Sequence, residues 1–159
     1  MKKIIFAAFI SFFGFMGSSM ATEVGCVSTT WRVVNNDKVC VEAFKDPDIS
    51  GVTCHVSYAK TGGVKGAFGM AEDPSRFSIA CRQTGAVVAQ KAIPVSSDTI
   101  FKERTSFIFK SLNVNRFWDK ENNSLVYLIT STKIIDGSPF NSISSVPLQP
   151  WGTQPPQMK

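Results

Sequence analysis

The stretch from Leu112 to Thr132 reads LNVNRFWDKENNSLVYLITST. Two runs rich in Val, Ile, Leu and aromatic residues, 112–118 and 125–132, flank a polar loop at 119–123. Polar residues of this kind tolerate turn conformations, and short apolar runs of this composition favour strands. The pattern predicts a β-hairpin. Because residues 125–129 are apolar on both faces, the second strand is expected to be central and covered on both sides.

Outward from this hairpin, similar runs are broken every ten residues or so by turn-forming residues. We expect strands near 27–34, 39–44, 52–59, 99–109, 112–118 and 124–134. This spacing predicts a mainly β chain: a single antiparallel β-rich domain, sandwich or barrel-like. At most one short helix is expected, near 74–82, where Asp73 and Pro74 suit a helix start. The alternation of Phe77, Ile79 and Cys81 would equally suit a strand.

Residues 1–21 have the features of a cleavable signal peptide. Lys2 and Lys3 precede an apolar run of about 13 residues, which is too short to cross a bilayer, and small residues follow up to Ala21. We expect cleavage after Ala21. A lipoprotein is the alternative, because Gly25 precedes Cys26, but Glu23 occupies a position where that recognition site needs an apolar residue.

Cleavage would leave 138 residues with 15 basic and 12 acidic side chains, a net charge of +3. A chain of this length fits one domain, which we place at 22–151. The charge is too small for a nucleic-acid binder, so no nucleic acid is expected as a partner. No cofactor is expected either, since the glycine-rich stretch at 60–73 matches neither G-x-x-x-x-G-K-[ST] nor G-x-G-x-x-G. The proline-rich end, 152–159, is expected to be a disordered tail.

Four cysteines remain in the mature chain: Cys26, Cys40, Cys54 and Cys81. In an oxidising compartment they are expected to pair, with three possible connectivities. Loop-closure entropy of about 3 kcal/mol per bridge is compatible with sequential pairing, which we favour. A tight turn at 35–37 would oppose it, since Cys40 would then lie roughly 20 Å along the strand from the residue facing Cys26.

Metal, redox and catalytic sites have little support in the sequence. His55 follows Cys54 directly, but adjacent strand residues point to opposite faces, and neither C-x-x-C nor H-x-x-H spacing occurs. We therefore expect no metal and name no catalytic residue. The carboxylates Glu42, Asp46 and Asp48 surround Pro47 in turn-like sequence and are interpreted as a polar loop.

Two surfaces are candidates for binding. The first is a glycine-rich loop whose backbone N–H groups and lysines suit an anion or a partner. Its residues are Lys60, Thr61, Gly62, Gly63, Lys65, Gly66, Glu72 and Asp73. The second is a basic strand face, formed by Lys102, Arg104 and Lys110 and extended by Arg116 from the next strand.

Several short motifs together resemble the CreA family of exported bacterial proteins. They include Val41-Glu42-Ala43-Phe44 with Asp46-Pro47, then residues 59–66, 71–73 and 104–106, Arg116-Phe117, Gly137-Ser138-Pro139 and Pro150-Trp151. The family is named for catabolite regulation and implies no particular biochemical activity. The resemblance implies the periplasm of a Gram-negative bacterium and a Cys54–Cys81 pair. Cys26 and Cys40 are additions to the family pattern, which fits their pairing with each other.

The sequence thus predicts a periplasmic binding or regulatory module of the cell envelope, whose partner is another envelope protein. The alternatives are an envelope enzyme, with a site assembled from distant residues such as Glu42, His55, Glu72 and Asp73, and a purely structural envelope protein. The oligomeric state, and whether either disulfide cycles, stay open.

Overall fold

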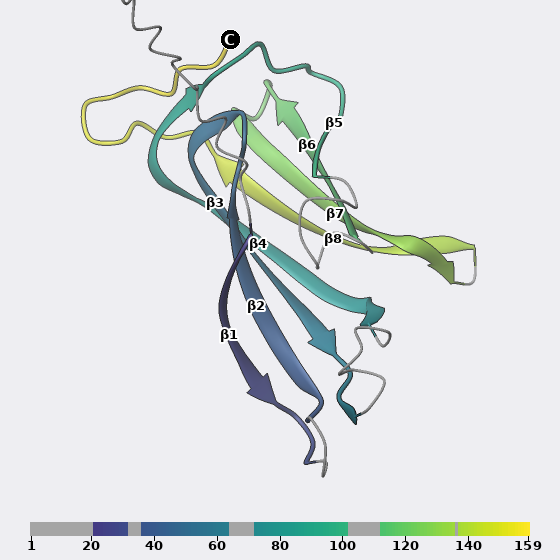
Figure 1. The fold of residues 1–159 in the computed structure, drawn as a ribbon. Coiled ribbons are helices and arrows are strands. Elements are labelled where there is room, and N and C mark those ends of the chain that lie inside the picture. The colour runs from purple at the N-terminus through teal and green to yellow at the C-terminus, as the bar shows by residue number, and fades with distance from the viewer. Residues whose placement is uncertain (1–20, 32–35, 64–71, 102–111, 136) are drawn as a thin grey trace, which may run out of the picture.

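The computed structural model describes residues 21–31, 36–63, 72–101, 112–135 and 137–159. Within these ranges the chain forms two four-stranded antiparallel sheets (Figure 1). The first sheet has the order β1-β2-β3-β4, with strands at Thr22–Ser28, Lys38–Lys45, Ile49–Lys60 and Glu72–Ala89. The second has the order β5-β6-β7-β8, with strands at Asp98–Phe101, Leu112–Asp119, Ser124–Ile135 and Ser138–Pro147. The mainly β prediction is confirmed.

The hairpin predicted from residues 112–132 is the β6–β7 pair. Trp118 pairs with Leu125 and Asp119 with Ser124. The carboxylate of Asp119 accepts hydrogen bonds from the backbone and side-chain nitrogens of Asn122, which closes the turn. β7 lies between β6 and β8, as expected for a central strand. One face of β7 is buried through Leu125, Tyr127 and Ile129, whereas the other face is half-buried.

Residues 74–82, where a short helix was the one allowed exception, belong to β4 instead. Alternation decides the outcome because Ile79 and Cys81 point into the core, and Cys81 lies opposite Cys54 on β3. The register of β3 against β4 then slips between Ser50 and Val52, so β4 carries extra residues around Gly85. At this slip Gly51 has a φ of 80°, and an added Cβ would lie 2.2 Å from the carbonyl oxygen of Ala86.

The two sheets share one core and meet along β4 and β8. Phe44 of β2 packs edge-on against Phe101 of β5, with ring centroids 4.9 Å apart. Backbone N–H groups of Ile79 and Cys81 donate to the hydroxyls of Ser142 and Ser144. Figure 1 shows β4 and β8 side by side at this junction. β8 was not predicted, because its serine-rich sequence leaves little apolar signal.

Both disulfides follow the favoured sequential pairing, Cys26–Cys40 and Cys54–Cys81. Each joins residues directly opposite each other on neighbouring strands. The objection from a tight turn at 35–37 fails because the connection is longer. It begins after β1 and is closed by the hydrogen bond from Thr29 N–H to the carbonyl oxygen of Asp37.

The C-terminal residues differ from the expected disordered tail. Ala89 and Gln157 are linked through N–H donation from Ala89 to the Gln157 carbonyl, and Gln157 N–H donates to the carbonyl of Val87. Ile93 N–H donates to the backbone carbonyl oxygen of Lys159, and Met158 packs against the core. Pro155 and Pro156 lack donors, but the residues around them have N–H and C=O groups that bind the end of β4. In the described part of the chain, no helix is long and apolar enough to span a membrane.

Candidate functional site

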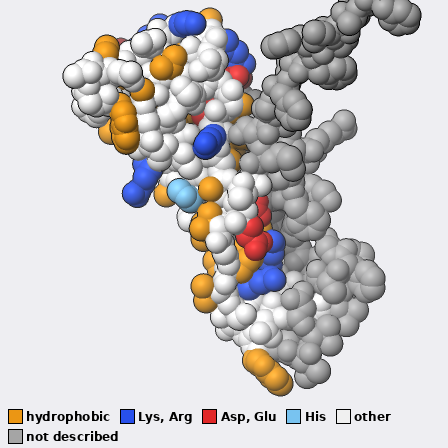
Figure 2. All heavy atoms as spheres, turned by 60° about the vertical axis from the view of Figure 1, so that its left-hand side comes forward, with side chains coloured by type: hydrophobic (Ala, Val, Ile, Leu, Met, Phe, Trp, Pro, Cys, Tyr) orange, Lys and Arg blue, Asp and Glu red, His pale blue; other side chains and the backbone are white. Residues whose placement is uncertain are grey.

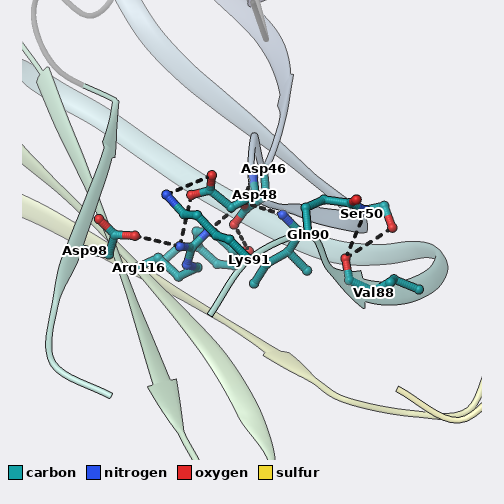
Figure 3. A network of polar contacts seen from close by, with 10 residues as sticks. Asp46, Asp48, Ser50, Val88, Gln90, Lys91, Asp98 and Arg116 are labelled. Atoms are coloured by element: carbon teal, nitrogen blue, oxygen red, sulfur yellow. Dashed lines mark hydrogen bonds and ion pairs between the residues drawn. The ribbon is translucent and has the colours of Figure 1, made fainter. Parts of the chain in front are cut away.

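The most unusual feature inside the protein is a fully buried arginine. Arg116 lies on β6, on the same face as the core residues Leu112 and Val114, and its side chain is 0% exposed. A buried guanidinium is stable only when its charge and donors are satisfied. The opposite sheet supplies the countercharge through the β2–β3 corner (Figure 3), while Nε of Arg116 is buried without a hydrogen-bond partner among the described residues.

Asp46 is the centre of the network. One carboxylate oxygen accepts from Arg116 Nη1 at 2.6 Å and from the backbone N–H groups of Asp48 and Ile49. The other accepts from the hydroxyl of Tyr127 at 2.7 Å. Asp46 therefore fixes the corner between β2 and β3 and ties it to β6 and β7.

Two further carboxylates complete the surroundings of Arg116. Its Nη2 lies 2.8 Å from Asp98 and 3.2 Å from Asp48, and Asp48 also pairs with Lys91 at 3.0 Å. Burial alone would lower the pKa of Arg116, but the charge and hydrogen bonds of Asp46 and Asp48 outweigh it and raise that pKa. The guanidinium stays charged.

The pKa of Tyr127 is also raised, first by burial and then by the negative charge of Asp46. Its hydroxyl therefore stays protonated and remains a donor. Both carboxylate oxygens of Asp46 and the hydroxyl proton of Tyr127 are used in this arrangement, which suits a structural clamp between the sheets better than acid–base chemistry.

A hollow of about 430 Å³ lies next to this corner, between the β2–β3 turn and the bend of β4. Its wall includes Ser50, Gly51, Thr53, Thr84 and Gly85. The hydroxyls of Thr53 and Thr84 bond to each other at 2.9 Å, and Ser50 donates to the carbonyl of Val88. These three hydroxyls are already paired, which limits what they can offer a ligand.

A different surface lies around β1, at the outer edge of the first sheet. All seven residues of β1 are exposed. We define the edge patch as Val24, Val27, Trp31 and Val39, whose exposed fractions are 62%, 72%, 84% and 39%. In Figure 2, separate hydrophobic side chains reach the surface in the lower half of the molecule and at its tip, and Figure 1 shows β1 in this half. Val27 and Val39 are neighbours, Val24 lies on the same strand and Trp31 follows it. Apolar exposure beside a sheet edge is typical of interaction sites.

The predicted glycine-rich loop is described only in part. Lys60 lies 3.6 Å from Glu23 and 5.1 Å from the ring centre of Tyr58, and Gly62 N–H donates to Asp37. Thr61 is exposed and Gly63 half-buried. Lys65 and Gly66 lie outside the described residues, as do the side chains of Glu72 and Asp73. The described start of the loop is therefore held against β1 and the β1–β2 connection.

The predicted basic strand face is corrected at Arg116, and its other residues are not described. Lys102, Arg104 and Lys110 lie outside the described residues. Arg116 does not extend an exposed row, because it points into the core and binds Asp46, Asp48 and Asp98. The polar-loop interpretation of Glu42 and Asp46 is likewise corrected: both are buried, and Glu42 accepts a hydrogen bond from Tyr58.

Of the residues suggested for an assembled enzyme site, the side chains of Glu42 and His55 are described, and they do not lie together. Glu42 pairs with Val56 on the buried face of the first sheet, whereas His55 pairs with Ala43 and points to the other face. One set of metal-type ligand atoms does lie within 4.8 Å in the described residues, formed by Glu23, Cys26 and Cys40. Its sulfurs are bonded to each other, so they are not thiolate ligands.

With this geometry in place, comparison with known proteins decides the family. The CreA protein family matches residues 24–151. The chain belongs to the CreA family. It is 48% identical over 135 residues to Protein CreA of Escherichia coli K12, covering 82% of this chain and 86% of that protein. The same figures hold for Protein CreA of Escherichia coli O157:H7. No solved structure matches the chain significantly.

Membership in the CreA family confirms the resemblance found in the sequence motifs. The family description and the relatives' names state no substrate, ligand or reaction. Two motifs that carried the resemblance now have a structural reason: Asp46-Pro47 and Arg116-Phe117 contribute the two halves of the buried ion pair. A signal for this pair was present, since Arg116 follows Leu112 and Val114 at the inward spacing of a strand.

Proposed function

We propose that this CreA family chain is an exported, periplasmic binding module of the cell envelope, and that it contacts another envelope protein through the edge patch. The observation that carries the proposal is the exposure of that patch on and beside β1, a strand that the Cys26–Cys40 disulfide links to β2. A strand held rigidly in its sheet loses little entropy when its exposed apolar side chains bind a partner.

Periplasmic location is supported by the two disulfides, which persist in oxidising compartments, and by the signal-like residues 1–21. Expression of the full chain in a Gram-negative host tests it. We expect osmotic shock to release the protein, and its measured mass to match a mature chain whose first residue is Thr22. A chain that retains Met1–Ala21 in the cytoplasm, or carries lipid on Cys26, would contradict this location.

A binding role is supported over catalysis by how the charged groups are used. The carboxylates of Asp46, Asp48 and Asp98 neutralise Arg116, and Asp46 has its oxygens bonded. The edge patch, in contrast, has apolar area to bury, and burial yields roughly 25 cal/mol per Å².

Photo-crosslinking in intact cells tests the contact. A photoreactive residue replaces Val27, and a matched variant carries it at Ile143 of β8, which is 63% exposed against 72% for Val27. We expect one discrete protein adduct from position 27 and none of that mass from position 143. Equal adduct patterns from both positions, or none from position 27, would refute the edge patch as the contact.

A further inference from the structure

We propose that the partner binds by strand addition: an extended, apolar segment of the partner lies along β1 and bonds to the outward-facing main chain of Cys26 and Ser28. This inference rests on the proposed function and specifies its chemistry. It names a backbone interaction, where the edge patch alone would require only apolar contact.

The register of β1 against β2 identifies the free main-chain groups. Thr29 N–H donates to the carbonyl of Asp37 at 2.8 Å, so Thr29 faces β2. The Cα atoms of Cys26 and Cys40 are 4.0 Å apart, the close spacing of a pair that exchanges no ladder bonds. Since hydrogen-bonded and non-bonded pairs alternate, Val27 faces β2, while Cys26 and Ser28 direct their N–H and C=O groups outward.

Within the described residues, the other outer strands are either contacted by another chain segment or shorter than β1. N–H groups of β4 donate to the hydroxyls of Ser142 and Ser144 on β8, and the end of β4 pairs with Gln157. The described part of β5 spans the four residues Asp98–Phe101. Within the described residues, β1 is the longest outer strand with no chain segment against its open side, and a bare edge is a template for an added strand.

The chemistry of β1 selects the occupant. Its side chains carry a single charge, Glu23, which is already 3.6 Å from Lys60. Val27 and Val39 lie side by side on the outer face, so an added strand with an apolar residue beside Val27 would continue this apolar row.

A partner segment fits this edge better than a second copy. The register shift between Glu23 and Gly25 bulges β1 just before its free groups. In a two-fold pair centred on Cys26, each copy would place its bulge opposite Ser28 of the other, where ladder pairing is disrupted. A foreign strand needs only the Cys26 and Ser28 groups and avoids this conflict.

Proline at position 28 tests the backbone bond. In Ser28→Pro the outward N–H is lost, while the bonds from Val27 and Thr29 to β2 remain, and proline is tolerated on strand edges. Ser28→Ala is the matched control. Both changes are introduced into the chain with the photoreactive residue at position 27, and thermal unfolding of each purified protein checks the fold.

We expect Ser28→Pro to lower the crosslink yield at least tenfold and Ser28→Ala to leave it within about twofold. Mass spectrometry should place the adduct in an extended apolar segment of the partner. A full yield in a folded Ser28→Pro protein would overturn strand addition but leave the proposed function standing. An adduct of two copies of this chain would overturn the foreign partner. Absence of any adduct before proline is introduced would instead refute the edge patch itself.

Discussion

Arg116 Nη1 and a carboxylate oxygen of Asp46 meet at 2.6 Å inside the protein, although they are 70 residues apart in the chain. Their contact joins β6 of one sheet to the β2–β3 corner of the other. With Tyr127 donating to the second oxygen of Asp46, three elements are fixed by one carboxylate. This buried ion pair thus holds the two sheets together, whereas apolar side chains are left exposed at the edge of β1.

Removing the arginine should be far more damaging than removing an exposed lysine of the same network. Arg116→Met leaves the carboxylate of Asp46 buried without its cation, which costs about 3–5 kcal/mol in the free energy of unfolding. Lys91→Met removes only an ion pair whose lysine is 57% exposed, worth about 0–1 kcal/mol. Urea unfolding of both variants measures the difference. Equal losses would show that the buried pair does not clamp the sheets.

The same substitution should destabilise the protein at one glycine and have almost no effect at another. Gly51→Ala places a Cβ 2.2 Å from the carbonyl oxygen of Ala86, at a φ of 80°, so the corner must shift. We expect the free energy of unfolding to fall by at least about 2 kcal/mol, because alanine is strained at this φ and its Cβ collides with the backbone. Gly25→Ala meets nothing within 4 Å and should stay within about 0.5 kcal/mol of the parent. Thermal or urea unfolding distinguishes them, and a harmless Gly51→Ala would contradict the described bend of β4.

Stability should fall at alkaline pH because of Tyr127. The pKa of its hydroxyl is raised in the folded protein, so the unfolded chain releases this proton first, near pH ~10. The contribution of Tyr127 is therefore complete below that pH and is lost progressively above it. Tyr127→Phe should be less stable at neutral pH, having lost its bond to Asp46, but should show a shallower alkaline decline. Parallel declines in urea midpoints from pH 8 to 11 would argue against this.

The β6–β7 hairpin could be predicted from sequence, whereas β4 and β8 could not. β4 packs Ile79, Cys81 and Val87 into the core, yet its start at Asp73-Pro74 also suits a helix. The β6–β7 hairpin has both an alternating apolar face and a turn closed by Asp119 and Asn122. β8 has neither: its contacts with β4 come from serine hydroxyls, and serine is equally common in loops.

The candidate site was harder to predict, for a physical reason. Arginine and aspartate are residue types expected on the surface, whereas strand alternation predicts that Arg116 points inside. Arg116 can be buried only because Asp46 neutralises it, and Asp46 is positioned by a different hairpin. The edge patch is similarly invisible in sequence, since Val24 and Val27 look like core residues until the sheet order places β1 outermost.

The open edge of β1 can be measured directly by residue-specific amide hydrogen exchange of the purified mature protein. The account predicts alternation: the amides of Val27 and Thr29 are protected by β2, and those of Cys26 and Ser28 exchange at rates close to an unprotected chain. Protection of Cys26 and Ser28 equal to that of their neighbours would contradict it, because the edge would then already be occupied.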